Sequence, residues 1–294
     1  MTIKTTRRMR SWLFAPGDSE KKMAKAIGGA ADIVILDLED AVAAENKPLA
    51  RDLVAHCLSQ NAAERGRIYV RVNPLDGPHT LADLAAVMPG RPGGIMLPKV
   101  YGRADAEAMH RYLEALEVAN GIEQGSTPLI VLVTETAQSM FHCGDFANLS
   151  RLVAMTWGAE DLSDALGANS STRPDGEYAF TFEMARSLCL LGATAAGVLP
   201  IETIATDFRD LDALKARAER VRREGYRGML AIHPAQVDVI NAAFTPNEAE
   251  VAEAREIVSL FEANPGAGAI GYRGGMLDRP HLSRARTLLA QAEE

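Results

Sequence analysis

The sequence contains little cysteine and no long apolar run. Its 294 residues include three cysteines, at positions 57, 143 and 189, and no C-x-x-C pair, so neither a disulfide framework nor a zinc site is predicted. No segment approaches the roughly 18 apolar residues of a membrane helix, and the N-terminal region has no signal-peptide core. We therefore predict a cytoplasmic protein that does not enter the membrane.

Positive charge is also in short supply. The chain has 31 basic and 39 acidic residues, a formal net charge of −8, which argues against nucleic acid as a main partner. A P-loop, a strand followed by G-x-G-x-x-G and a G-x-S-x-G elbow are all missing, which disfavours nucleotide-phosphate and serine hydrolase chemistry. Anionic small molecules remain candidate ligands through local arginines and lysines.

The residues that are present alternate between short apolar segments and longer segments with helical spacing. Eight such repeats favour a closed (β/α)8 TIM barrel over an open, doubly wound sheet. The predicted strands are residues 11–16, 32–40, 67–74, 94–100, 128–136, 152–162, 194–203 and 228–234. The predicted helices include residues 19–28, 48–59, 104–119, 179–191 and 211–224.

After His233 the pattern changes. A helix is predicted over residues 247–263, followed by the glycine-rich segment 264–275 and a final amphipathic helix from Pro280. Glycine-rich segments are typical attachment points of mobile lids. We therefore predict a barrel over residues 1–240 and a C-terminal helical extension, acting as a lid, over residues 241–294.

Acidic residues follow two neighbouring predicted strands. In a TIM barrel the catalytic groups collect at the carboxyl ends of the strands, so Glu135 and Asp161 are predicted to lie side by side at the barrel mouth. This arrangement suits Mg²⁺, which usually takes one or two carboxylates and keeps its other positions for water and substrate. A single acid at such a position can instead be a helix cap or part of a surface ion pair.

Other polar residues at strand ends leave alternatives open. Arg71 lies in an apolar strand, where it either forms a core ion pair or faces a carboxylate or a developing oxyanion. In the segment DLED, alternation places Asp37 and Glu39 on one face and Asp40 on the other, so only one set can face the mouth. Glu202 ends the seventh predicted strand.

Seven motifs occur in an order that resembles a known family. They are RSWLFAPGDSEKKMAKA, ILDLEDAV, RVNP, MLPKV, TETA, GAEDL and IHPAQ. Together they resemble the HpcH/HpaI aldolase / citrate lyase β-subunit (CitE-like) family, and the pattern is most similar to malyl-CoA and citramalyl-CoA lyases. The resemblance spans nearly the whole chain. It implies a (β/α)8 barrel, a homotrimer or homohexamer, a Mg²⁺ site and reversible cleavage of a 3-hydroxyacyl-CoA thioester.

The resemblance also implies roles for individual residues. The metal-binding Glu and Asp of the family match Glu135 and Asp161, which would also contact substrate. The substrate-binding Arg matches Arg71, and the acids of the DLED motif match Asp37 and the predicted catalytic residues Glu39 and Asp40.

Two features of the later sequence bear on the resemblance. The tail motif MLDRPH resembles a segment whose Asp reaches into the site of a neighbouring subunit, which makes Asp278 a predicted catalytic residue. The seventh strand departs from the family, because many relatives have Asp in place of Glu202. The residues that would contact CoA are not predicted.

The reaction that the resemblance implies is a retro-aldol (retro-Claisen) cleavage to acetyl-CoA and a 2-oxo acid. Arg71 would stabilise the enolate oxygen and Asp278 would move the proton at the acetyl carbon. Three alternatives remain: a malyl-CoA or citramalyl-CoA thioesterase, a metal-dependent pyruvate aldolase that does not use CoA, and a citryl lyase subunit that works with an acyl-carrier protein in a multiprotein citrate lyase.

Overall fold

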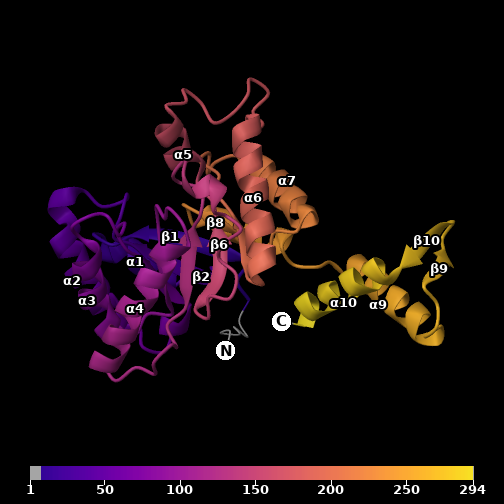
Figure 1. The fold of residues 1–294 in the computed structure, drawn as a ribbon, viewed down its shortest axis with the longest axis horizontal. Helices are drawn as coiled ribbons and strands as arrows, with labels where there is room; N and C mark the ends of the chain where they lie inside the picture. Colours follow the sequence, from indigo (N-terminus) through magenta and orange to yellow (C-terminus); the bar gives the residue numbers. More distant parts are fainter. Residues whose placement is uncertain (1–7, 294) are drawn as a thin grey trace.

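A closed barrel of eight parallel strands forms the body of the protein (Figure 1). The structure, a computed structural model, describes residues 8–293. The strands pair in chain order, and β8 closes the barrel against β1. They are β1 (Ser11–Pro16), β2 (Ile33–Asp37), β3 (Ile68–Arg71), β4 (Gly94–Leu97), β5 (Leu129–Leu132), β6 (Leu152–Thr156), β7 (Leu199–Glu202) and β8 (Gly228–Ala231). The prediction of a (β/α)8 barrel is confirmed.

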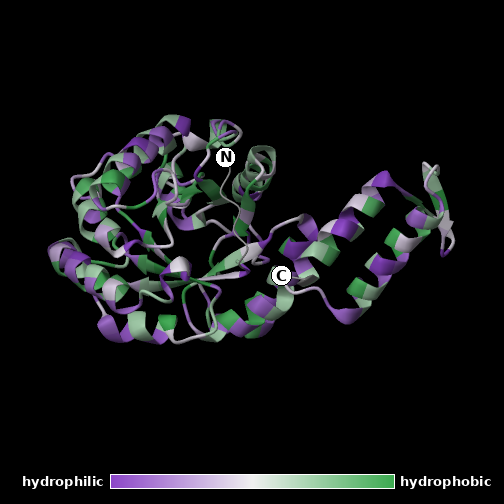
Figure 2. Cartoon of the chain, turned by 90° about the horizontal axis from the view of Figure 1, so that it is seen from below, coloured by the Kyte–Doolittle hydropathy of each residue, from purple (hydrophilic) through white to green (hydrophobic). Residues whose placement is uncertain are grey.

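Helices surround the barrel, and Figure 2 shows hydrophilic and hydrophobic residues alternating along them, as in helices with one face on a core. They are α1 (Glu20–Ile27), α2 (Lys47–Gln60), α3 (Thr80–Val87), α4 (Arg103–Ala119), α5 (Ala159–Leu166), α6 (Phe180–Ala196), α7 (Leu211–Glu224) and α8 (Ala235–Ala243). A single 3₁₀ turn, Ser139–Phe141, stands in place of a helix between β5 and β6. None of the helices of the described chain is long and apolar enough to cross a membrane.

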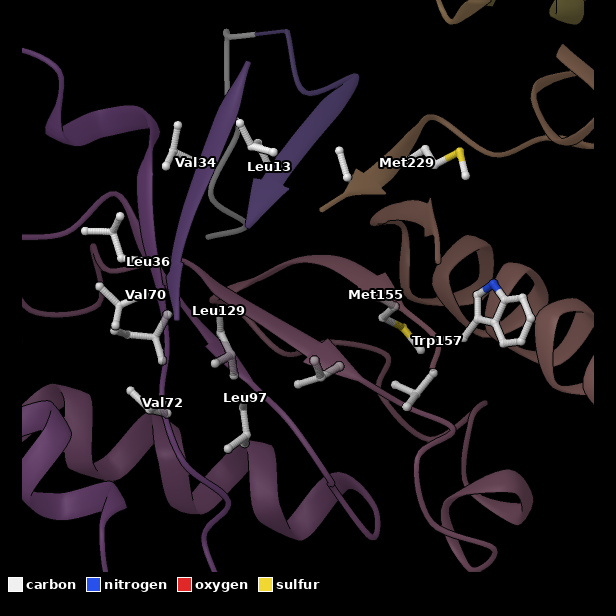
Figure 3. Close-up of a cluster of buried hydrophobic side chains, with 14 of the residues drawn as sticks. Leu13, Val34, Leu36, Val70, Val72, Leu97, Leu129, Met155, Trp157 and Met229 are labelled. Carbon is white, nitrogen blue, oxygen red and sulfur yellow. The ribbon is translucent and has the colours of Figure 1, made fainter. Parts of the chain in front are cut away.

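The period of two along each strand builds two cores. One set of side chains, including Trp12, Ile35 and Tyr69, fills the barrel interior. The alternate set packs between the strands and the helices; Figure 3 shows part of this outer core, including Val34 and Val70. Because residues two apart share a face, the strand positions that follow Ile35 and Tyr69 on the inner face are Asp37 and Arg71. Apolar burial therefore aims these two polar side chains into the barrel mouth.

The extension begins after α8 and projects from one side of the barrel (Figures 1 and 2). It consists of α9 (Glu248–Ala263), β9 (Ala269–Tyr272), β10 (Gly275–Asp278) and α10 (Arg279–Glu293). Phe261, Leu277 and Leu282 form its small core. The division at residue 240 stays a prediction. The last barrel helix continues to Ala243, and residues 1–7 of the predicted barrel domain lie outside the described residues.

The glycine-rich segment is not the open break that the sequence suggested. Most of it forms the antiparallel hairpin β9–β10. Its turn contains Arg273 and Gly274, whose φ angles of 48° and 80° are the left-handed values that tight two-residue hairpin turns require. Glycine therefore serves the turn here, and the segment lies within the extension instead of linking it to the barrel.

Candidate active site

Asp37 and Arg71 meet at the carboxyl end of the barrel. They are direct neighbours in the β2–β3 register. The Arg71 Nε and Nη2 groups donate to the two Asp37 carboxylate oxygens over 2.7 and 2.6 Å. Burial raises the pKa of the Asp37 carboxyl, but the Arg71 charge and hydrogen bonds outweigh burial, and the pKa is lowered. Asp37 therefore stays ionised and fixes the plane of the guanidinium, whose Nη1 lies 2.9 Å from Glu39.

Alternation predicted that Glu39 and Asp40 lie on opposite faces of a strand, but neither residue is in a strand. Strand β2 ends at Asp37, whose carboxylate accepts from the backbone N–H groups of Glu39 and Ala41 and turns the chain. Past this turn the period of two no longer applies, and both Glu39 and Asp40 contact the ammonium of Lys99. Glu39 is buried, whereas Asp40 is exposed.

Lys99 contacts three carboxylates of this site, and no role was predicted for it. Its ammonium contacts Glu39, lies 3.1 Å from Asp40, and lies 3.1 Å from Asp161. Its φ of 51° is in the left-handed region, which a non-glycine residue adopts only when its surroundings enforce it. The available signal is its place directly after Pro98 at the end of a predicted strand.

Glu135 is held by backbone groups on two sides. Its Oε2 accepts from the Lys99 backbone N–H over 2.6 Å. On the other side, a Cβ on Gly158 would lie 3.0 Å from the Glu135 Cγ, so glycine permits this close approach. Burial, and then the charges of Asp161 and Glu39, raise the pKa of the Glu135 carboxyl well above its ordinary value. The side chain therefore sits where added positive charge would be strongly favoured.

The sequence predicted that Asp161 ends the sixth strand, but in the structure it does not. The strand stops at Thr156, and Asp161 lies in the first turn of α5. Its side chain is 28% exposed, and it lines the same cavity as Glu135. The carboxylates predicted as a pair are thus brought to one cavity by a strand end and a helix start.

The donor set fits a magnesium ion. The described residues contain no group of three or more His, Cys, Asp or Glu side chains arranged to hold a metal. A cation between Glu135 and Asp161 would therefore have two protein carboxylates and would depend on water or substrate for its other ligands, which is the habit of Mg²⁺. Burial and then the neighbouring carboxylates raise the pKa of Glu135, and such an ion would offset both.

The cavity at the barrel mouth has a volume of about 170 Å³, and its charged and apolar lining residues come from different elements. The charged half consists of Asp37, Arg71, Glu135, Glu160 and Asp161, from the ends of β2 and β3, the loop after β5 and the start of α5. The other half is mostly apolar; its lining includes Trp157, Tyr178, Ile204, Leu230 and Ile232. Such a lining suits a small anionic ligand that carries an apolar substituent.

Two further residues singled out in the sequence do not line this cavity. Glu202 lies on the outer face of β7, because Ile201 takes the inner face, and it pairs with Arg217 of α7 over 2.6 Å. Asp278 is the last residue of strand β10 in the extension, directly before α10, and its Oδ1 lies 2.5 Å from His281 Nδ1.

A parallel (β/α)8 barrel with an acidic, arginine-bearing cavity at its carboxyl mouth has the architecture of a barrel enzyme. The chain belongs to the HpcH/HpaI aldolase/citrate lyase family, whose model matches residues 10–234.

Relatives match the chain over nearly their full length. It is 37% identical over 287 residues to a (3S)-malyl-CoA thioesterase of Cereibacter sphaeroides, covering 97% of this chain and 94% of the relative. A citrate lyase subunit beta-like protein of Mycobacterium tuberculosis is 35% identical, with coverage of 96% and 95%. An L-malyl-CoA/beta-methylmalyl-CoA lyase of C. sphaeroides is 33% identical, with coverage of 97% and 94%.

Solved structures show the same fold. The protein CitE of M. tuberculosis, in complex with magnesium, acetoacetate and coenzyme A, superposes with a TM-score of 0.82 at 33% identity, covering 98% of this chain and 99% of that one. A citrate lyase beta subunit from the same organism, complexed with oxaloacetate and magnesium, gives a TM-score of 0.70 at 33% identity, with coverage of 82% and 98%. Magnesium and small oxo acids thus occur together in these relatives.

Proposed function

We propose that this protein is a Mg²⁺-dependent CoA-ester lyase that cleaves a 3-hydroxyacyl-CoA of the malyl-, citramalyl- or citryl-CoA type to acetyl-CoA and a 2-oxo acid. The observation that carries the proposal is the cavity at the barrel mouth, where Glu135, Asp161 and Arg71 face one space. Relatives named as malyl-CoA lyase and structures containing magnesium, oxo acids and coenzyme A support it.

Glu135 and Asp161 are the residues that would hold the metal. When bound, Mg²⁺ supplies Lewis acidity toward the hydroxyl and carboxylate oxygens of the substrate. Glu135 is fixed by the Lys99 backbone N–H, and Asp161 is partly exposed. The two carboxylates would thus offer such an ion one rigid and one solvent-facing oxygen ligand.

Arg71 is proposed to stabilise the enolate oxygen that develops on acetyl-CoA when the carbon–carbon bond breaks. Its Nε and Nη2 edge is committed to Asp37, so the Nη1 edge, shared with Glu39, is left for a ligand. Glu39 and Asp40 do not line the cavity. Their part in this proposal is to hold Lys99 and Arg71 in place and not to touch the substrate.

Asp278 is proposed to exchange the proton at the acetyl carbon in the site of a neighbouring subunit. Support comes from its place in the extension, which projects from one side of the barrel (Figure 1), and from its absence from the lining of the cavity at the barrel mouth. A cyclic homotrimer or homohexamer would let each extension reach the next chain. We further propose that the protein acts in the cytoplasm on free CoA thioesters.

Product analysis tests the proposed function. Purified protein is incubated with Mg²⁺ and malyl-, citramalyl- or citryl-CoA, and the products are identified by mass. A lyase yields acetyl-CoA and a 2-oxo acid, whereas a thioesterase, the name carried by several relatives, yields free CoA and the intact hydroxy acid. Activity of the single purified chain on free CoA esters excludes dependence on an acyl-carrier protein. Free CoA as the first product would contradict the proposal.

A further inference from the structure

The apolar half of the cavity has a wall supplied by a residue outside the barrel strands. Tyr178 lies near the end of the loop between α5 and α6, and it lines the cavity together with Trp157. The two rings meet edge to face with their centroids 5.0 Å apart. No residue of this loop was singled out from the sequence, because its polar composition resembles that of an ordinary surface loop.

The ion pair between Glu202 and Arg217 supports the Tyr178 side chain. Arg217 of α7 donates from Nη2 to the Tyr178 hydroxyl oxygen over 3.0 Å and to Glu202 Oε1 over 2.6 Å. Its guanidinium carbon also lies 5.0 Å from the centre of the Tyr178 ring. The Glu202 side chain is fully buried and that of Arg217 is 17% exposed, so the pair is a fixed support.

The same arginine fixes a second part of the wall. Arg217 Nη1 donates to the backbone carbonyl of Ile204 over 3.2 Å, and Ile204 also lines the cavity. One guanidinium therefore joins strand β7, the loop after it and the loop before α6. The Glu202–Arg217 pair, which does not line the cavity, thus holds two parts of the cavity wall in place.

We infer that Tyr178 is a specificity-determining residue that limits the size of the 2-oxo acid, and that Arg217, anchored on Glu202, is its positioning residue. The inference rests on the proposed function. The charged half of the cavity accounts for the carboxylate and oxygens of the acid, so its carbon substituent faces the apolar half. In that half, the Tyr178 ring forms the part of the wall that the substituent would meet.

The fit of the substituent can be tested by binding. Glyoxylate, pyruvate and 2-oxobutyrate differ by one carbon at each step, and in an apolar pocket one such step is worth roughly 10- to 200-fold in discrimination. Isothermal titration with Mg²⁺ present gives the affinities without any cleavage. In Tyr178→Ala we expect the preference to shift toward the larger acids by about tenfold or more, whereas Tyr178→Phe retains the ring and the wild-type order.

A matched control separates positioning from general loosening of the loop. Arg220 lies three residues after Arg217 on α7 and pairs with Glu177 of the same loop over 2.7 Å, but it does not line the cavity. We expect Arg217→Met to shift the size preference in the same direction as Tyr178→Ala, and Arg220→Met to leave size preference and basal activity unchanged. Circular dichroism confirms that each variant is folded.

A spectroscopic signal reports on the ring directly. The chain has two tryptophans, so in a Trp12→Phe background the emission comes from Trp157, and we expect Arg217→Met to change it while Arg220→Met does not.

The outcomes of the binding test are distinct. An unchanged order of affinities in Tyr178→Ala overturns the inference, and so does an equal shift in Arg217→Met and Arg220→Met. If wild-type protein binds the acids with the expected size order but cleaves no CoA ester, the proposed function fails and the size limit stands. If wild-type protein binds none of the acids, both fail.

Discussion

Glu135 and Asp161 line one cavity but have different surroundings. Glu135 is buried, with its pKa raised by burial and by neighbouring carboxylates, whereas Asp161 is partly exposed. Asp161 therefore meets solvent, whereas Glu135 does not. A buried carboxylate that neighbouring carboxylates repel can lose its charge without loss of stability.

Removing either charge should abolish metal binding. We expect Glu135→Gln and Asp161→Asn to lose Mg²⁺ binding in isothermal titration and to reduce turnover to background. Thermal unfolding should be unchanged or slightly higher for Glu135→Gln, because the amide removes repulsion and still accepts the Lys99 N–H. Near wild-type turnover at low Mg²⁺ in either variant would contradict the metal assignment.

Arg71 tests the importance of a planar fork. Lysine keeps the charge but cannot bond Asp37 through two parallel N–H groups and still present a third edge to the cavity. We expect Arg71→Lys to lower kcat by roughly 10²-fold, the usual cost of removing one oxyanion donor. Steady-state kinetics on the ester that the wild type cleaves provides the measurement, and wild-type rates would reassign Arg71 to a structural pair.

At the scale of elements, one buried pair joins the helix layer to the strands. Glu117 of α4 receives Arg151 Nη1 and Nη2 over 2.6 and 2.7 Å, together with the backbone N–H groups of Gly125 and Thr127. Burial raises the Glu117 pKa, but the hydrogen bonds from Arg151 and from these neighbours outweigh it and lower the pKa to about 2. The pair lies beside β5 and β6, at the barrel end opposite the mouth.

This pair should make stability depend on acid in a defined range. Because the folded pKa is lowered, its contribution is complete above the ordinary pKa of about 4.5 and is lost as the pH falls toward 2. We expect Glu117→Gln to cost about 3–5 kcal/mol at neutral pH, because Arg151 is left buried and unpaired. In urea unfolding from pH 7 to pH 3, the difference from wild type should shrink below pH 4.5; a constant difference would contradict it.

The order of elements was predictable, but their ends were not. The eight apolar segments correspond to β1–β8 because burial on both faces leaves a strong signal. Helices α3, α5 and α8 are not among the helices named from the sequence, and α5 begins inside the predicted strand 152–162. The predicted second and sixth strands continue through DLED and GAEDL. In the structure the Asp37 carboxylate turns the chain after β2, and β6 stops at Thr156, before Gly158.

The candidate site was predictable where inward alternation continues a strand and not elsewhere. Arg71 follows this rule, and Glu135 follows soon after a strand end. Lys99 and Tyr178 depend on a left-handed backbone and on a loop held by another element, so no periodic pattern in the sequence indicates them. Glu202 shows the reverse case: it ends a strand, yet alternation turns it toward α7.

At the scale of the whole molecule, the extension predicts a shared site. If Asp278 serves the neighbouring subunit, Arg71→Ala and Asp278→Ala are each impaired alone. When the two proteins are unfolded, mixed equally and refolded, about a quarter of the sites should contain both intact residues. Activity should return toward that fraction. Full activity of Asp278→Ala alone, or no recovery despite confirmed subunit exchange, would contradict the shared site.

We propose that the protein breaks the carbon–carbon bond of its substrate, and deuterium uptake distinguishes this cleavage from hydrolysis of the thioester. Malyl-CoA is incubated with the protein and Mg²⁺ in D₂O, and the acetyl-CoA formed is analysed by mass. Cleavage leaves a carbanion-like acetyl group that takes its third methyl hydrogen from an exchangeable acid, so we predict acetyl-CoA carrying one deuterium and an equal amount of glyoxylate. Free CoA with intact malate, and no labelled acetyl-CoA, would contradict carbon–carbon cleavage and indicate hydrolysis of the thioester.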